Sequence, residues 1–345
     1  MFTITKEDIS SILEDFGITS KVIVFTELQR YHYEKDNPES KEVRLIIKVD
    51  LDNGQPLVIR FKNEGDVTLD IINAQSRFAN LLADRYVETP AIYMTNGQYA
   101  RWYSINGYDV IVTVEAFVAG ELHTVDEGIA KKTGSLLARM HNIAEQADFH
   151  VQNDVLFDPL RRNDLFSFQD FELNKDFLVT LDETLYKSIV EEHARVFRKI
   201  RIFENEPRYA VQGDISDCNL YQTADGKIGV FDFNRCGDNV LYYDAIMQAI
   251  FEARLMDYPN EIAGKQENII LSAFLKGYHQ ERPFTNEQRE VFPYLYALVS
   301  AFWSSDIKWD ENSLCHAVEA GNTETARQWL KEIHNRILSR PKMPL

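Results

Sequence analysis

The segment from residue 212 to residue 234 constrains this 345-residue chain more than any other part of it. It places Asp214, then Asn219 five positions later, then Asp232 thirteen positions after that. An Asp can accept the proton of an attacking hydroxyl group, and carboxylate and amide oxygens are ligands that suit Mg²⁺. The spacing therefore predicts a site where the γ-phosphate of a nucleotide is transferred.

Asp and Asn are also common turn formers at strand ends, so the residue types alone have a purely structural interpretation. The flanking sequence favours the functional one. Residues 209–211, 220–222 and 228–231 are apolar enough to form short strands, and Asp225-Gly226 between the last two is a strong hairpin signal. A strand, loop, hairpin and strand in this order would hold all three polar residues in place.

The segment resembles the motif of the aminoglycoside phosphotransferase and choline kinase superfamily, usually His-Gly-Asp-x-x-x-x-Asn followed by an Ile/Val-Asp-Phe/Leu strand. Residues 133–141 resemble the family's Gly-x-x-Leu-Ala-x-Leu/Met-His helix, and residues 242–244 resemble its Tyr-Asp helix start. These matches come in the family's order, and with the N-terminal strands they cover about residues 20–300. The resemblance implies an α+β, two-lobed protein-kinase-like fold and an enzyme that phosphorylates a small molecule.

The rest of the chain fits an antiparallel-sheet N-lobe and a mostly helical C-lobe. Residues 118–120 resemble the hinge between lobes, so we expect a nucleotide-binding N-lobe over 1–119. The C-lobe, 120–345, would carry the catalytic loop, the metal site and the acceptor-binding helices. Apolar runs predict strands at 22–25, 43–49, 57–62 and 110–118, and helical periodicity predicts helices at 6–16, 66–86, 129–142, 183–205, 241–256, 264–281, 286–304 and 323–338.

The resemblance implies a role for each polar residue of the motif. Asp214 would position and deprotonate the acceptor hydroxyl, while Asn219 and Asp232 would hold Mg²⁺. The family places a phosphate-anchoring cation on the third strand, where this chain offers Arg60 and Lys62. The two residues are two positions apart, so both point to the same face of the strand. Arg60 matches the family position better, and Lys62 is its competitor.

Three departures from the family pattern open a second hypothesis, a pseudokinase that binds a nucleotide or a partner without turnover. The helix carboxylate that pairs with the strand cation is expected near Gln75. A Gln can hydrogen-bond Arg60 and orient it, but it cannot form an ion pair. Gln212 stands in place of the motif's His. Residues 33–40, expected to cover the nucleotide, contain no glycine. A chance match in a non-kinase interaction protein is a third, weaker interpretation.

The resemblance also suggests where the two substrates bind. ATP or GTP would place its base against the backbone of residues 115–118, and we take Glu115 and Phe117 as the nucleotide-contacting positions. Trp303 and Asp306 are candidates for contact with a cationic acceptor, by cation–π and ionic interaction. A helix C-terminus with buried aromatic side chains is the simpler interpretation of this stretch. Asp217, inside the catalytic loop, is a further candidate for contact with the acceptor or with a second shell of metal ligands, and capping of the loop backbone is an equally good interpretation.

The formal net charge of −17 argues against nucleic acid and anionic membranes as partners and favours cationic small molecules. An acidic surface that only keeps the protein soluble is an equally good interpretation. The chain has three scattered cysteines, no run of about 18 apolar residues, and an acidic N-terminus unlike a secretory signal. We therefore expect a reduced, cytoplasmic protein; the sequence leaves its oligomeric state and its acceptor open.

Overall fold

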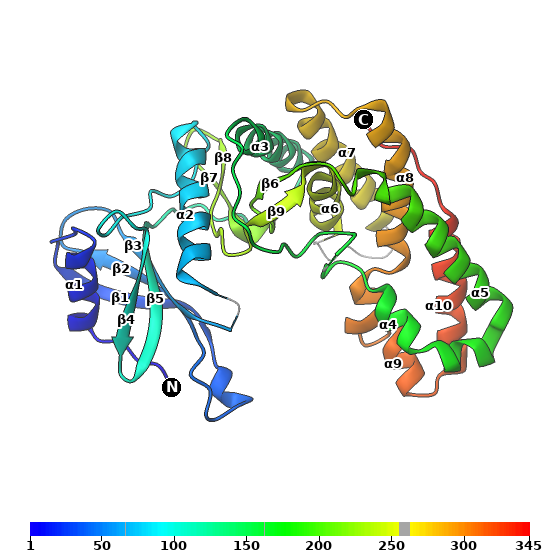
Figure 1. Ribbon diagram of the computed structural model, residues 1–345, viewed down its shortest axis with the longest axis horizontal. Helices are drawn as coiled ribbons and strands as arrows, with labels where there is room; N and C mark the ends of the chain where they lie inside the picture. The colour runs from blue at the N-terminus through cyan, green and yellow to red at the C-terminus, as the bar shows by residue number, and fades with distance from the viewer. Residues whose placement is uncertain (66, 162, 255–262) are drawn as a thin grey trace. The chain divides into compact units, whose positions relative to one another are not determined.

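The computed structural model describes residues 1–65, 67–161, 163–254 and 263–345. The chain divides into two compact units, each made of three segments (Figure 1). The first unit comprises Met1–Leu122, Phe149–Asn153 and Cys218–Asn234, and the second comprises His123–Asp148, Asp154–Asp217 and Arg235–Leu345. The predicted functional boundary between residues 119 and 120 stays a prediction.

A five-stranded antiparallel sheet in the order β1-β2-β3-β5-β4 forms the centre of the first unit. This confirms the predicted antiparallel sheet near the N-terminus. The sequence did not reveal β4, whose residues carry four polar or aromatic side chains between apolar ends. The strands are β1 (Val22–Tyr31), β2 (Val43–Leu51), β3 (Leu57–Asn63), β4 (Ala100–Ile105) and β5 (Tyr108–Ala116).

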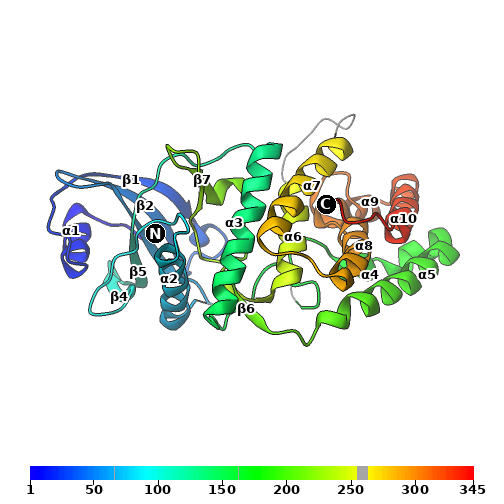
Figure 2. The same ribbon diagram turned by 90° about the horizontal axis from the view of Figure 1, so that it is seen from above.

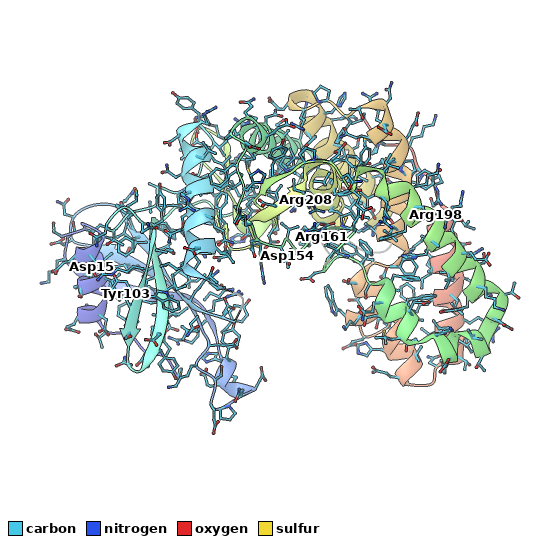
Figure 3. The ribbon with its side chains drawn as sticks, in the orientation of Figure 1. Asp15, Tyr103, Asp154, Arg161, Arg198 and Arg208 are labelled. Carbon is cyan, nitrogen blue, oxygen red and sulfur yellow. The ribbon has the colours of Figure 1, made fainter. Side chains whose placement is uncertain are left out.

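Two helices cover opposite faces of this sheet (Figure 1). Helix α1 (Lys6–Asp15) packs on the face formed by the inward residues of β2, β3 and β5, and α2 (Leu69–Asp84) packs near Ile111 and Ala100 on the other face. Each helix starts at a threonine, Thr5 or Thr68, whose side chain accepts a backbone hydrogen bond from the first turn. Figure 3 shows Asp15 at the end of α1 beside Tyr103 of β4, whose hydroxyl donates to Asp15 Oδ2 across 2.9 Å.

The predicted hairpin of the motif is present as β7 (Leu220–Gln222) and β8 (Ile228–Val230). It belongs to the first unit through backbone hydrogen bonds on both sides. The amide of Leu122 donates to the carbonyl of Leu220 across 3.0 Å, and the amide of Val230 donates to the carbonyl of Glu88 across 2.9 Å. The second of these bonds holds Val230, the last residue of β8, two positions before Asp232.

The second unit is mostly helical, as predicted (Figure 2). The predicted helix at 183–205 begins earlier, at residue 175, and has a non-helical residue at Asp182, so the sequence pattern captured only its second part. The unit contains α3 (Glu127–Gln146), α4 (Phe168–Leu173), α5 (Lys175–Ile200), α6 (Leu241–Arg254), α7 (Ala263–Glu281), α8 (Asn286–Ala301), α9 (Leu314–Glu319), α10 (Thr323–Leu338) and the short strands β6 (Arg208–Val211) and β9 (Gly237–Val240).

Helices α3 and α7 approach each other so closely that only glycine fits at their crossing. A Cβ atom added at Gly134 would lie 2.0 Å from the carbonyl oxygen of Phe274, and one added at Gly277 would lie 1.9 Å from that of Lys131. A real Cβ atom never comes so close to backbone oxygen, so both positions require glycine. Gly134 is part of the family-like motif, and this packing gives the physical reason for its residue type.

His141 ties α3, α6 and α7 together inside the second unit. It is fully buried, with Nδ1 lying 2.9 Å from the Tyr278 hydroxyl and Nε2 lying 2.9 Å from Asp244 Oδ2. A carboxylate only accepts hydrogen bonds, so Nε2 carries a proton and donates to Asp244. The last residue of the motif at 133–141 thus contacts the Asp of the motif at 242–244. Asp244, in the first turn of α6, thereby connects this helix to α3.

Candidate functional site

Strand β3 carries two buried cations on the face that it turns toward α2. Leu57, Ile59 and Phe61 belong to the apolar core under α1, and residues alternate between faces along a strand. Arg60 and Lys62 therefore lie on the opposite face, where they are 9% and 6% exposed. A buried cation must be paired with an anion or leave a large desolvation cost, so their partners decide what this face can bind.

Arg60 forms ion pairs with two carboxylates of the first unit. Its Nε and Nη2 atoms both lie 2.9 Å from Glu115 Oε1, and its Nη1 atom lies 3.1 Å from Asp232 Oδ2. Burial acts against the charge, but Asp232 and Glu115 outweigh it and raise the pKa of the guanidinium. The structure thus brings together the predicted strand cation and the predicted metal ligand, which are 172 residues apart in the sequence.

Asp232 has an unusual backbone conformation for a residue with a side chain. Its φ is +57°, in the left-handed region, and its Oδ1 accepts a hydrogen bond from the amide of Asn234 across 3.1 Å. Burial opposes the charge of Asp232, but Arg60 and Lys62 overcome it and lower the pKa of the carboxyl group. Asp232 is therefore ionised near neutral pH, and strained conformations of this kind cluster at functional sites.

Lys62 is the second cation of this face. Burial lowers the pKa of its ammonium group to about 8, while the charge of Asp232 acts in the opposite direction. Lys62 is thus mostly charged at pH 7 and adds to the positive potential around Asp232. Arg60 has the direct contact with Asp232, and the choice between Arg60 and Lys62 as the phosphate anchor stays a prediction.

Asn219 lies in the same unit as Asp232. It is buried, and its carbonyl oxygen accepts a hydrogen bond from the amide of Phe231 across 3.0 Å. This bond places Asn219 next to the strand that leads into Asp232. Both residues offer the oxygen atoms that a hard divalent cation prefers.

Asp214 belongs to the second unit, where its loop is held by glutamines. Gln212 Oε1 accepts a hydrogen bond from the Asp214 amide across 2.8 Å, so the residue in place of the family's His supports the loop. The amide of Ile215 donates to Gln248 Oε1 of α6 across 3.1 Å. Gly213, with φ +83°, lets the chain turn; a Cβ atom there would lie 2.4 Å from the carbonyl oxygen of Arg235.

Gln75 of α2 is buried and donates from Nε2 to the carbonyl oxygen of Asn234 across 3.1 Å. It therefore supports the turn that follows Asp232. Its expected part in orienting the strand cation stays a prediction. An amide carries no charge, so Gln75 cannot supply the counter-ion that Arg60 needs.

The stretch expected to receive the nucleobase follows the end of β5. The amide of Ala116 donates to the carbonyl of Ala91, and the amide of Phe117 donates to the carbonyl of Pro56, both across 2.8 Å. The Glu115 side chain instead reaches Arg60, a contact that the sequence analysis missed. This contact depends on the register of β3 against β5, which pairs Val58 with Glu115 and Arg60 with Thr113.

The residues proposed for acceptor contact lie in the second unit. The guanidinium of Arg254 lies 5.0 Å from the Trp303 ring centre, and Arg336 forms an ion pair with Asp306 through a short contact. Both groups thus already contact arginines of the chain, and an acceptor amine would have to compete with them. Asp217 is partly buried in the catalytic loop. These three assignments stay predictions.

Glu252 of α6 is a polar group that the sequence analysis missed. It is fully buried, and among residues 1–254 and 263–345, apart from the undescribed residues 66 and 162, neither of its carboxyl oxygens has a hydrogen-bond partner. Burial raises the pKa of Glu252 to about 8. The negative charge of Asp217 also raises this pKa, whereas the nearby Thr133 side chain lowers it. The Thr133 hydroxyl donates to the carbonyl of Ile129 across 3.0 Å, which explains why it does not satisfy Glu252.

In the described part of the chain, no cluster of three or more His, Cys, Asp or Glu side chains is arranged to hold a metal ion. One carboxylate and one amide, as in Asp232 and Asn219, offer oxygen ligands that suit Mg²⁺, because Mg²⁺ in nucleotide sites takes its other ligands from phosphates and water. The helices of the described residues include none that is both long and apolar enough to span a membrane.

Comparison with family models gives one match of direct relevance. The model of the phosphotransferase enzyme family matches residues 45–284, which is most of the chain. The matched region includes Arg60, Glu115, Asp214, Asn219 and Asp232. A search of the curated proteins gave no match.

Solved structures with a similar fold include three small-molecule kinases. An amicoumacin kinase, hAmiN, in complex with AMP-PNP, Ca²⁺ and Ami is 14% identical with a TM-score of 0.54, covering 85% of this chain and 86% of its own. A microcompartment-associated aminopropanol kinase is 14% identical with a TM-score of 0.53, covering 91% and 90%. Spectinomycin phosphotransferase APH(9)-Ia with ADP and spectinomycin is 11% identical with a TM-score of 0.52, covering 97% and 98%. At these identities the likeness establishes the two-lobed, kinase-like α+β fold.

Proposed function

Because the chain belongs to the phosphotransferase enzyme family and is thus an enzyme of the kinase class, we propose that it transfers the γ-phosphate of ATP or GTP to a hydroxyl group of a small molecule. One observation carries most of this proposal. A buried strand cation, Arg60, lies 3.1 Å from Asp232, a carboxylate that follows the hairpin of the catalytic motif. Phosphoryl transfer needs such a cation and a metal-binding carboxylate in one place.

Each residue of the motif has a defined part in the proposed reaction. Asp214 orients the acceptor hydroxyl and takes its proton as the oxygen attacks the γ-phosphorus, and the nucleoside diphosphate leaves. Arg60, with Lys62 beside it, stabilises the charge on the phosphate oxygens. Gln75 supports this arrangement through the turn after Asp232. The backbone at Glu115 and Phe117 receives the nucleobase.

Asn219 and Asp232 would hold Mg²⁺, and their oxygen donors fit this ion. At this place the ion would supply the positive charge that offsets the negative charge developing on the transferred phosphate. Asn219 is buried, and the lowered pKa of Asp232 keeps its carboxyl group ionised at neutral pH, as a metal ligand requires.

A cationic acceptor, such as an amino alcohol or an aminoglycoside-like compound, fits this chain best. The net charge of −17 attracts cations over long range. The related structures are those of kinases named for amicoumacin, aminopropanol and spectinomycin. We propose Asp217, Trp303 and Asp306 as contacts of such an acceptor.

The test is formation of ADP or GDP in a screen of hydroxyl acceptors with Mg-ATP and Mg-GTP, using wild type and Asp214→Asn. We expect acceptor-dependent product that the variant does not form, with amine-bearing acceptors ahead of neutral ones. Nucleotide binding without turnover on any acceptor would favour the pseudokinase hypothesis. Choline, homoserine and simple sugars complete the panel, since they separate charge preference from hydroxyl reactivity.

A further inference from the structure

We propose that Glu115 of β5 is the carboxylate that positions Arg60 for the nucleotide phosphates, in the place that kinases of this type give to a helix glutamate. This inference rests on the proposed function, since it assigns Arg60 to phosphate. It concerns the side chain of Glu115, whose backbone we assigned to the nucleobase.

Helix α2 has no glutamate that can pair with Arg60. No Glu occurs between Gly65 and Tyr86, and the position expected for one is Gln75. The acidic residues of the helix, Asp70 in the first turn and Asp84 in the last, are exposed to solvent. The negative charge that a buried Arg requires must therefore come from another element.

Strand β5 supplies that charge from the same face of the sheet. Arg60 pairs in register with Thr113, and Val58 pairs with Glu115, so Arg60 and Glu115 are diagonal neighbours on one face. Their side chains are 10% and 14% exposed. Both strands lie inside the sheet, with β3 between β2 and β5, so this pair is held by two hydrogen-bonded strands rather than by a helix that can move.

The two carboxylates bind different edges of the guanidinium. Glu115 takes Nε and Nη2, which leaves Nη1 directed at Asp232. An Arg held along one edge has little freedom to rotate, so its remaining donors point in a fixed direction. That direction is toward Asp232, the proposed metal ligand, beside which the nucleotide phosphates would bind.

The arrangement also explains how Arg60 can bind a phosphate while a carboxylate still balances its buried positive charge. When a phosphate oxygen replaces Asp232 at Nη1, the contact with Glu115 remains. A cation with a single carboxylate partner would lose that partner when it binds the phosphate, and the carboxylate would then stay buried without a counter-ion, which costs free energy. Glu115 is thus a positioning residue, and the strand pair does the work that a strand–helix ion pair would do.

The test is calorimetric binding of Mg-AMP-PNP to wild type, Glu115→Gln, Arg60→Ala and the double variant. We expect Glu115→Gln to weaken binding about 10-fold or more and to change the Kd less than two-fold when Arg60 is already Ala, since the carboxylate acts through Arg60. Glu115→Asp, which keeps the charge but shortens its reach, should fall between wild type and Glu115→Gln. Asp109→Asn, at the exposed start of β5, is the matched control and should leave the Kd unchanged.

The outcomes separate this inference from the proposed function. If wild type does not bind Mg-AMP-PNP, the proposed function fails and the inference fails with it. If wild type binds and Glu115→Gln matches it within two-fold, the inference alone is overturned. Effects of Glu115→Gln and Arg60→Ala that multiply in the double variant would also overturn it, because they would show that Glu115 acts independently of Arg60. Unfolding midpoints of wild type, Glu115→Gln, Arg60→Ala and the double variant identify any variant whose weaker binding reflects a folding defect. If Glu115→Gln is such a variant, the Kd of Glu115→Asp decides whether the inference stands.

Discussion

Arg60 Nη1 lies 3.1 Å from Asp232 Oδ2, so the cation expected to anchor phosphate holds the carboxylate expected to bind the metal. Each group neutralises charge on the other inside a mostly buried face. Binding of a metal–nucleotide complex would replace this contact by two new ones, metal to Asp232 and phosphate to Arg60. The pair thus keeps both groups charged and in place before the substrate arrives.

This relationship predicts different costs for the two cations of β3. Arg60→Gln should lower kcat/KM for the nucleotide by roughly 100-fold or more, because it removes a charge-assisted contact to the reacting phosphate. Lys62→Gln should cost less than about 10-fold, since Lys62 acts through the local potential. Steady-state kinetics with a fixed acceptor measure both. A larger loss from Lys62→Gln would assign the phosphate anchor to Lys62 instead.

The role of Asp214 predicts a separation of binding from turnover. Asp214→Asn keeps the size of the side chain and its loop contacts but removes the proton acceptor, so kcat should fall by about 100-fold or more. The Kd for Mg-AMP-PNP should stay within about three-fold of wild type. Turnover at the wild-type rate would remove Asp214 from the chemistry.

Glu252 predicts a pH dependence of stability within the second unit. Its raised pKa of about 8 means that the folded protein keeps a proton that the unfolded chain loses near the ordinary value of about 4.3. Between pH 5 and pH 8 the folded state therefore binds the extra proton, and stability falls as pH rises, by up to about 1.4 kcal/mol per pH unit from this group. Asp217, which raises this pKa further, contributes to the effect.

Glu252→Gln mimics the protonated carboxyl and lacks this titration. We expect its free energy of unfolding, measured with urea, to equal or exceed that of wild type, with a difference that grows from pH 5 to pH 8. A constant difference across this range would mean that Glu252 is ionised in the folded protein.

The contact between α3 and α7 predicts opposite effects for two glycines on one helix. Gly277→Ala would bring its Cβ atom to 1.9 Å from the carbonyl of Lys131 and should destabilise the protein by about 1–3 kcal/mol. Gly264→Ala, in the first turn of α7, meets no atom within 4 Å and should be neutral or stabilise by up to about 1 kcal/mol. Urea unfolding of both variants measures the difference, and equal effects would contradict the described close packing.

Much of the fold could be predicted from the sequence because local patterns determine it. The alternation along β3 placed Arg60 and Lys62 on one face, and the Asp-Gly turn gave the β7–β8 hairpin. The family-like motifs gave the kinase-like fold. Strand β4 was missed because Ala100 and Ile105 enclose a run of polar and aromatic residues with no clear period.

The contacts between distant residues could not be predicted in the same way. The pairing of β3 with β5 decides that Glu115 reaches Arg60, and no local pattern encodes the register of two strands about 50 residues apart. The same holds for Trp303 and Asp306, whose arginine neighbours come from other helices. The residue types indicate the kind of chemistry, whereas the partner of each residue depends on tertiary structure.

The central claim, that Asp232 belongs to a metal-dependent nucleotide site, is tested most directly by thermal unfolding with and without Mg-ATP or Mg-GTP, in wild type and Asp232→Asn. A ligand that binds only the folded protein stabilises it, by about 2.7 kcal/mol at a ligand concentration 100 times the Kd, and so raises the unfolding midpoint. We predict a rise of several degrees in wild type that requires Mg²⁺ and is lost in Asp232→Asn. No rise in wild type at millimolar nucleotide, or an equal rise in the variant, would contradict the account.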